Sequence, residues 1–400
     1  MIALVPKEKC SGCSACLNAC KTGALSMETD ETGFWFPVIA REKCVECGAC
    51  VRACPALETP AYQSDAPKAY IAQNKAEEIR RQSTSGGAFT ALAKAVIAKG
   101  GAVFGAAMDG EYAVSHVWVE KESDLARFRG SKYVQSRIGL AYREAETLLR
   151  AGRPVCFSGT PCQIYGLKRY LGREYENLYT VDVVCRAAPS PKVLRKYLAY
   201  QKEKYPAYDR VVFRDKGRGY SYSGVALYAG EKVLYRGGSE SDPWLRLFLG
   251  GFCNREACYE CPYQTGARAS DITLWDCWDT QRYAPEWDDN KGTTAMAVWT
   301  EKGGGLAASA AGDMRYKEIP LDSLRHKLDR QPLSRAKADA KALYRDCDAL
   351  TPKQFMEKYA PLHGGVRLKS GLRRALHALR LHDFIRKLVH RGRRQRNKSR

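Results

Sequence analysis

Eight cysteines near the amino terminus constrain this chain more than any other feature of its sequence. They form two runs of the same spacing, C-x2-C-x2-C-x3-C, the second 34 residues after the first. Three thiolates at such intervals wrap a compact turn around one iron–sulfur cluster, and the fourth cysteine of each run reaches the other cluster. The pattern therefore predicts two 4Fe–4S clusters. The first has the ligands Cys10, Cys13, Cys16 and Cys54, and the second has Cys44, Cys47, Cys50 and Cys20.

The same pattern predicts the fold of residues 1–60. Small residues inside the runs, such as Gly12 and Gly48, let backbone N–H groups approach the sulfurs, and residues 23–39 indicate a short hairpin. A ferredoxin-like α+β domain meets both requirements. Zinc also binds C-x2-C pairs, but eight cysteines in a duplicated run favour clusters.

Composition narrows the class of protein. The chain has 16 cysteines and no apolar run near the roughly 18 residues that a membrane span needs. Its first nine residues hold too short an apolar stretch for a secretory signal. We therefore expect a cytoplasmic protein, in which thiols stay reduced and available to metals.

Residues 66–150 open the body of the chain with small polar residues and then an amphipathic pattern. Ser85 is a natural N-cap, and a helix follows that ends at residues 100–101. Gly86 and Gly87 leave its free N–H groups open to a phosphate or a flavin edge, although a capped helix alone also explains the motif. Strands are expected at residues 102–108 and 114–119, before a donor-rich loop at residues 130–136.

Residues 151–345 contain a βαβ unit that delivers two further cysteines. The strand at residues 154–158 leads to Cys162, and the strand at residues 178–184 ends at Cys185. Strands joined by a crossover helix lie parallel, so both thiols meet at the edge where α/β proteins bind ligands. With Cys258 and Cys261 they complete a four-thiolate set, for which a third 4Fe–4S cluster and a zinc ion are competing hypotheses.

The other cysteines fit structural roles. Cys156, Cys277 and Cys347 lie in apolar or helical surroundings, and Cys253 is ambiguous. A thiol nucleophile at Cys162 would need a base such as His116, which no sequence signal positions.

Five motifs in order carry a resemblance to the beta subunit of coenzyme F-420 (8-hydroxy-5-deazaflavin) hydrogenases and dehydrogenases. They are residues 83–92 (STSGGAFTAL), 130–136 (GSKYVQS) and 159–168 (GTPCQIYGLK), Cys185 with Pro189 and Ser190, and Cys258-x2-Cys261 followed by Arg268-x-Ser-Asp-Ile-Thr. The resemblance covers roughly residues 7–359.

This resemblance implies FAD beside the clusters. The residues it assigns to the flavin are Ser83, Ser85, Gly86, Gly87, Thr90, Ser131, Lys132, Tyr133, Gln135, Ser136, Gly159 and Thr160. Two departures leave the organic substrate open. Arg186 and Ala187 follow Cys185 where the family often has His-Gly, and Trp275 stands where it often has glycine.

Residues 346–400 are predicted to form a helical basic tail. From Arg367 onward there are 13 Lys and Arg against one acid, so this tail holds +12 of the net charge of +21. An apolar stripe begins at Leu372 and continues through Leu379 to Leu388. Such a helix can lie on an anionic membrane surface, dock an acidic partner or pack on its own domain. Specific nucleic-acid binding is not expected, because the tail lacks stacking aromatics.

The sequence thus predicts a ferredoxin-like α+β domain, an α/β body with a mixed sheet and a basic helical tail. The expected function is that of an iron–sulfur flavoprotein oxidoreductase, which passes electrons between ferredoxin-type clusters and FAD for two-electron chemistry on an organic substrate, deazaflavin-like or other. A non-catalytic electron-relay subunit of a larger redox complex is the alternative. The expected partner is a redox protein or a small-molecule donor, with a peripheral place at the inner membrane face as an option. No catalytic residue is assigned.

Overall fold

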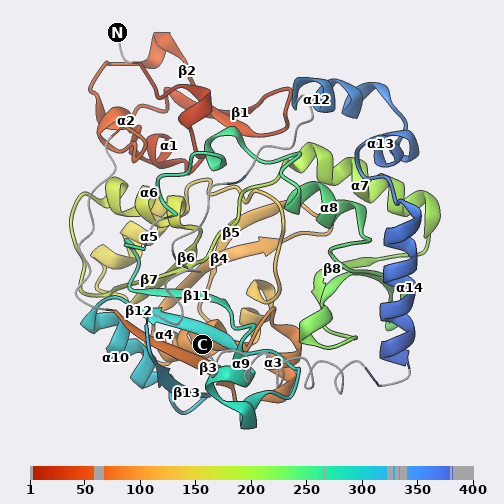
Figure 1. Cartoon of the computed structure of the whole chain (residues 1–400). Coiled ribbons are helices and arrows are strands. Elements are labelled where there is room, and N and C mark those ends of the chain that lie inside the picture. Colours follow the sequence, from red (N-terminus) through yellow and green to blue (C-terminus); the bar gives the residue numbers. More distant parts are fainter. Residues whose placement is uncertain are drawn as a thin grey trace, which may run out of the picture.

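The computed structural model describes residues 3–57, 67–264, 266–321 and 340–378, together with residues 328, 333 and 381. Three sheets organise these residues (Figure 1). The polar link expected from residue 58 onward lies outside the described residues up to residue 66, and so does the tail beyond Leu381 with its apolar positions Phe384 and Leu388.

The amino-terminal unit is built around a hairpin, as the sequence predicted. Strand β1 (Leu25–Thr29) pairs antiparallel with β2 (Trp35–Ile39). Helices α1 (Ala15–Ala19) and α2 (Ala49–Arg52) each begin inside a cysteine run, after a residue in the left-handed conformation. A 3-10 turn precedes each run, η1 (Lys7–Lys9) and η2 (Arg41–Lys43). The repeat in the sequence is therefore a repeat in the structure.

An eight-stranded sheet forms the body, in the order β13-β3-β12-β11-β7-β6-β4-β5. Its strands are β3 (Lys68–Asn74), β4 (Ala102–Met108), β5 (Val114–Val119), β6 (Val155–Gly159), β7 (Leu178–Val183), β11 (Ile272–Asp276), β12 (Thr294–Val298) and β13 (Met314–Ile319). The strands from β11 to β4 are parallel to one another and the remaining pairs are antiparallel. The expected mixed sheet is confirmed, and β6 and β7 are parallel neighbours as the βαβ pattern predicted.

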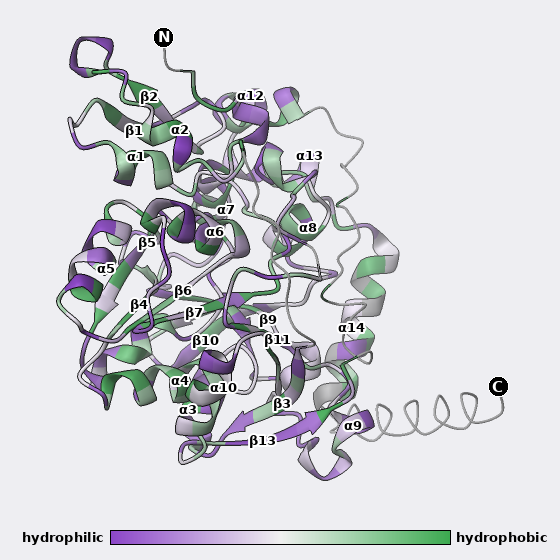
Figure 2. Cartoon of the chain, turned by 90° about the vertical axis from the view of Figure 1, so that its left-hand side faces the viewer, coloured by the Kyte–Doolittle hydropathy of each residue, from purple (hydrophilic) through white to green (hydrophobic). Residues whose placement is uncertain are grey.

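Helices cover both faces of this sheet. On one face α4 (Ala88–Ile97) and α10 (Glu301–Ser309) share a core with Val103, and on the other α5 (Ala141–Arg150) and α6 (Pro161–Leu171) share a core with Phe104. Successive strand residues point to opposite faces, so these two neighbours enter different cores. Figure 2 shows the apolar strands enclosed between the helices.

The start of α4 differs from the expectation. Its N-cap is Gly87, at φ +79°, and the cap forms no side-chain hydrogen bond. The hydroxyl of Ser85 instead lies 3.0 Å from that of Thr294 on β12. Ser85 therefore fixes its loop to the sheet and does not cap the helix.

A three-stranded sheet, β10-β9-β8, carries a second core beside the body. Its strands are β8 (Arg210–Asp215), β9 (Gly224–Ala229) and β10 (Lys232–Gly237), and the helices around it are α7 (Pro191–Lys204), α8 (Pro243–Leu249), α12 (Ala340–Ala349), α13 (Pro352–Tyr359) and α14 (Gly364–Ala378). Phe34 and Phe36 of the amino-terminal hairpin also enter this core. The shorter elements are α3 (Glu77–Gln82), η3 (Glu122–Phe128), η4 (Tyr220–Tyr222), η5 (Glu256–Cys258), α9 (Thr280–Tyr283) and η6 (Pro285–Trp287).

The amino-terminal unit is docked against α6. Cys13, Ala15 and Ala53 belong to the same core as α5 and α6. A Cβ placed on Gly166 of α6 would lie 2.9 Å from the sulfur of Cys13 and 3.1 Å from the hydroxyl of Tyr142. The two parts are thus in contact at a cysteine.

We expect Gly166→Ala to destabilise the protein by about 1–3 kcal/mol, because the added methyl has no room at this contact. Urea unfolding of the full chain measures the change. Gly305→Ala in α10 is the matched control, since nothing lies within 4 Å of its Cβ position and alanine favours helix. Equal stability of the two variants would show that the contact yields without strain.

Candidate iron–sulfur and cofactor site

The four cysteines that the sequence assigns to the first cluster line one cavity. These are Cys10, Cys13, Cys16 and Cys54, and the space that they line is partly open to solvent. The fourth of these thiols comes from the second run, as the crossed ligation requires. We refer to this set as the inner set.

Electrostatics show how closely the inner thiols approach one another. Burial, and then the neighbouring thiols of Cys10 and Cys54, raise the pKa of Cys16 to about 12. Burial likewise raises the pKa of Cys13 well above its usual range. A bound metal reverses this preference, because thiolates are its ligands. The donor set therefore fits a cluster.

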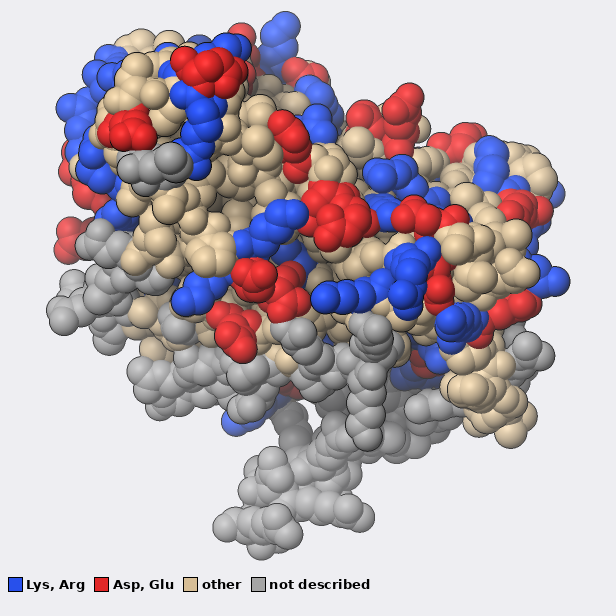
Figure 3. All heavy atoms as spheres, turned by 90° about the horizontal axis from the view of Figure 1, so that it is seen from above, with Lys and Arg blue, Asp and Glu red and all other residues tan. Residues whose placement is uncertain are grey.

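The second set of thiols lies nearer the surface. Cys47 is exposed, whereas Cys20, Cys44 and Cys50 are half-buried. The pKa of Cys50 is raised by burial and also by the thiols of Cys20 and Cys44, so these residues are neighbours. We refer to these four cysteines as the outer set. Seen from above, this end of the molecule carries interspersed basic and acidic side chains (Figure 3).

Neither set converges on a single point. Within the described parts of the chain, no three side chains of His, Cys, Asp or Glu are placed to hold one metal ion. The thiolates of a 4Fe–4S cluster bind different irons, so they surround a volume instead of meeting at one atom.

The four body thiols come from separate elements of the fold, and whether they share one cluster stays a prediction. Cys162 is the second residue of α6, Cys185 follows β7, and Cys258 ends η5 shortly before Cys261. The sulfur of Cys258 accepts a hydrogen bond from the N–H of Ala188 at 3.4 Å. Such N–H···S contacts are typical of cluster surroundings.

One tyrosine, which the sequence did not single out, borders both inner and body thiols. Tyr263 is 2 % exposed, and its hydroxyl has no hydrogen-bond partner in the described structure. Burial raises its pKa, and the thiols of Cys13, Cys162, Cys54 and Cys261 each add to the rise. Tyr263 therefore stands where the ferredoxin-like unit meets the body.

Arg255 is the second residue that sequence reasoning missed. It is fully buried, and its guanidinium donates to the carbonyl oxygens of Cys10 at 2.6 Å and Trp35 at 3.1 Å. It also donates to Oε1 of Gln135 at 3.1 Å, and Nε2 of Gln135 donates to the carbonyl of Ser11. Gln135, expected beside a flavin, is therefore engaged at the ferredoxin contact.

The two loops that the sequence proposed for a flavin do meet. The hydroxyls of Thr84 and Ser131 lie 2.9 Å apart. Gly86 is held so closely to β3 and β12 that a Cβ there would lie 2.4 Å from the carbonyl oxygen of Ala72. Thr90 is instead buried inside α4, and Ser83, buried at the end of α3, donates its hydroxyl to the carbonyl of Ile79.

Cations gather around these loops. Nζ of Lys132 donates to two carbonyls of its own loop, and burial lowers its pKa to about 8. Nζ of Lys216 donates to the carbonyl of Ser85 at 2.8 Å, and burial, followed by the charge of Arg80, lowers its pKa to about 7. Arg214 donates to Tyr133 and pairs with a carboxylate of β11 at 3.0 Å, yet its buried Nη2 has no partner among the described residues. These donors and charges fit an anionic ligand.

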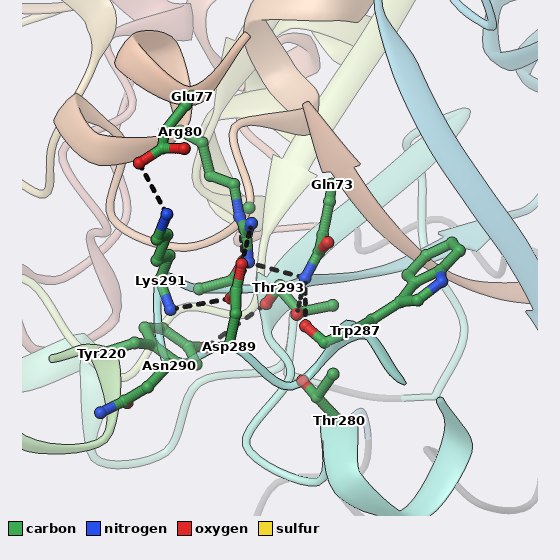
Figure 4. Close-up of polar contacts among 12 residues, drawn as sticks. Gln73, Glu77, Arg80, Tyr220, Thr280, Trp287, Asp289, Asn290, Lys291 and Thr293 are labelled. Atoms are coloured by element: carbon green, nitrogen blue, oxygen red, sulfur yellow. Dashed lines mark hydrogen bonds and ion pairs between the residues drawn. The ribbon is translucent and has the colours of Figure 1, made fainter. Parts of the chain in front are cut away.

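Next to the loops, a polar network that runs from buried Gln73 to exposed Lys291 links α3 to the segment before β12 (Figure 4). Arg80 pairs with Asp289 through both of its terminal nitrogens. Gln73 donates to the Thr293 hydroxyl at 2.7 Å, and Lys291 pairs with Glu77 at 2.7 Å. The network fixes the carbonyls that Lys216 contacts.

A hydrogen-bonded chain joins Cys162 to the loop that contains Lys132 and Ser136. The hydroxyl of Thr160 lies 3.2 Å from the sulfur of Cys162, and Gln163 links the backbone of Thr160 to the hydroxyl of Ser136. That hydroxyl lies 3.2 Å from Nδ1 of His116. Burial lowers the pKa of His116 to about 4. Ser136, Thr160 and the adjoining Gly159 thus stand between thiol and loop.

Comparison with known protein families matches two parts of this chain. The family described as the C terminus of the beta subunit of coenzyme F420 hydrogenase/dehydrogenase matches residues 152–323. Two descriptions of a 4Fe-4S dicluster domain match residues 9–57 and 36–87. The chain carries this family's C-terminal domain behind an iron–sulfur domain. The resemblance and the ferredoxin-type fold expected from the sequence are both confirmed, and the chain is an iron–sulfur electron-transfer protein of an oxidoreductase family.

Among solved structures, a chain of the F420-reducing nickel–iron hydrogenase complex from Methanosarcina barkeri is similar to this one. The identity is 16%, the TM-score is 0.47, and the match covers 67% of this chain and 87% of that chain. No curated protein matches in sequence. No helix in the described ranges is long and apolar enough to cross a membrane.

The crossed ligation of the clusters gives a direct prediction. Cys54→Ser lies in the second run but should remove the same electron paramagnetic resonance (EPR) signal as Cys13→Ser, with a loss of about four irons per chain. Cys47→Ser and Cys20→Ser should remove the other signal. Cys156→Ser, a buried cysteine in the core under α4, is the control that keeps both. If Cys54→Ser resembles Cys47→Ser instead, each run binds its own cluster.

Proposed function

We propose that this protein is an iron–sulfur flavoprotein oxidoreductase acting on an organic substrate, with a third 4Fe–4S cluster on Cys162, Cys185, Cys258 and Cys261 and with FAD at the Ser85 and Ser131 loops. The observation that carries the proposal is a continuous series of contacts from the inner set to the loop of Lys132. The inner set contacts α6, Cys162 lies on α6, and the Thr160–Ser136–His116 chain leads from Cys162 toward Lys132. Clusters would carry single electrons, and a flavin would exchange them singly or in pairs.

The residues of this chain have distinct parts in the proposal. Thr160 and the N–H of Ala188 stabilise thiolates at Cys162 and Cys258. Lys132 and Arg214 hold negative charge, for which the diphosphate of a dinucleotide is the natural match, whereas Lys216 fixes the Ser85 loop through its carbonyl. His116, kept neutral by burial, exchanges hydrogen bonds without adding charge between thiol and loop. Ser83, Thr90 and Gln135 are left out of the flavin site, because Ser83 and Gln135 form hydrogen bonds elsewhere and Thr90 is buried within α4.

Anaerobic purification with iron, sulfide and flavin quantitation tests the proposal. We expect about twelve irons and one FAD per chain. Cys258→Ser should drop to about eight irons and keep the flavin, whereas Lys132→Met should keep the iron and lose flavin, because it removes a buried cation from the loop. About eight irons in the unmodified protein would reject the third cluster. Protein without flavin absorbance would favour the relay-subunit alternative.

The surface of α14 supports a second, separate proposal, that the protein rests on an anionic membrane. Leu368, Leu372 and Ala375 form an exposed stripe at helical spacing, with the two leucines 77 % and 62 % exposed. On the docked side Ser370 is buried, and Arg373 reaches Glu240 at 3.4 Å. An apolar stripe beside a tail of charge +12 matches acidic headgroups over an apolar interior.

Vesicle sedimentation tests this surface. The protein should bind vesicles with phosphatidylserine more strongly than neutral ones, and binding should weaken in high salt because the attraction is screened. Leu368→Ser with Leu372→Ser should reduce binding at least several-fold, because about 0.8 kcal/mol is lost per buried methylene. Leu140→Ser, an exposed leucine outside α14, is the matched control. Binding that depends neither on lipid charge nor on the two leucine-to-serine substitutions would point to an acidic protein partner.

A further inference from the structure

Arg255 is a buried cation with no anion beside it in the described structure. It is fully buried, and all three of its hydrogen-bond acceptors are neutral: two carbonyl oxygens and the amide oxygen of Gln135. No carboxylate of the described residues forms an ion pair with it. An isolated buried charge is strongly unfavourable, so a native structure keeps one only where something compensates it.

Aromatic rings supply part of the compensation. The guanidinium lies 4.1 Å from the ring centroid of Phe36 and 5.3 Å from that of Phe34. A ring face attracts a cation through its quadrupole, but it carries no net charge. The positive charge is therefore not neutralised by these contacts.

The loop of the inner set also lies against the Arg255 guanidinium. A Cβ on Gly12 would lie 2.9 Å from Nη1 of Arg255, so the guanidinium packs against the backbone between Cys10 and Cys13. Its Nε also donates to the carbonyl of Cys10 at 2.6 Å. Arg255 thus lies directly against the loop of the inner set.

We infer that Arg255 is a positioning residue whose charge is balanced by the cluster on the inner set, and that it raises the reduction potential of that cluster. The inference rests on the clusters of the proposed function. A 4Fe–4S cluster with four thiolates is anionic and gains a further negative charge on reduction, so a fixed cation stabilises the reduced state. By linkage, reduction also strengthens the docking of the ferredoxin-like unit, because Arg255 holds that unit to the body.

The test is an EPR-monitored redox titration of the full chain with its clusters, with the two ferredoxin signals assigned by the Cys54 and Cys20 variants. Arg255→Gln should shift the equilibrium of the inner cluster toward oxidation by about tenfold, which is a potential lower by 59 mV for one electron. The outer cluster should not move. Arg255→Lys keeps the charge and should shift far less.

Arg246→Gln is the matched control, since Arg246 also donates to two backbone carbonyls, those of Ala360 and Pro361, but at the α8–α13 side. A merely structural role would destabilise the protein without moving the inner potential. An unchanged inner potential in Arg255→Gln overturns the inference.

A second measurement uses the unmodified protein, so it holds even where a variant fails to assemble. Hydrogen exchange of residues 10–16 and 34–36 should be slower in the reduced than in the oxidised protein. Equal exchange in the two states overturns the coupling between docking and reduction. Purified protein with no iron at the inner set would instead overturn the proposed function, which keeps the two failures distinct.

Discussion

The contact between the inner cysteine loop and the body fixes the position of the ferredoxin-like unit on the rest of the structure. On one side α6 offers Gly166, which has no side chain and so lets Cys13 approach the helix. On the other side Arg255 donates to Cys10 and Trp35, which come from a cysteine run and from the hairpin of the same unit. A cysteine loop is thus held from two directions, and its thiols lie near Cys162 and Tyr263.

The parallel strands explain why this contact falls where it does. Side chains at the carboxyl ends of β6 and β7 lie at one edge of the sheet, and α6 starts there with Cys162. The loop of Cys258 and Cys261 reaches the same side, because η5 contacts η1 of the amino-terminal unit. A general property of α/β sheets thereby places the body thiols toward the ferredoxin-like unit.

Local patterns made the cysteine runs, the hairpin and the βαβ unit predictable. Each depends on residues a few positions apart, whose spacing is set by chain geometry. Arg255, Tyr263, Arg214 and Lys216 were not predicted. Arg255 and Tyr263 flank the Cys258–Cys261 motif, but the motif's spacing does not give their contacts. Their roles come from contacts such as that between Arg255 and Cys10, which are 245 positions apart. Ser85 failed as a cap for the same reason, since Thr294 from a distant strand competes for its hydroxyl.

The inner and outer sets differ in burial, and burial affects how easily a cluster is reduced. The outer set includes the exposed Cys47, whereas Cys10 and Cys13 of the inner set are 8 % exposed. Burial disfavours added negative charge, so by itself it would make the inner cluster harder to reduce than the outer one. Electron transfer from the outer to the inner cluster would then be unfavourable in free energy. A fixed cation at the inner set opposes this penalty without admitting water, and Arg255 is the one buried cation that the described structure places against that loop. In the proposed function, Arg255 therefore keeps the buried inner cluster reducible.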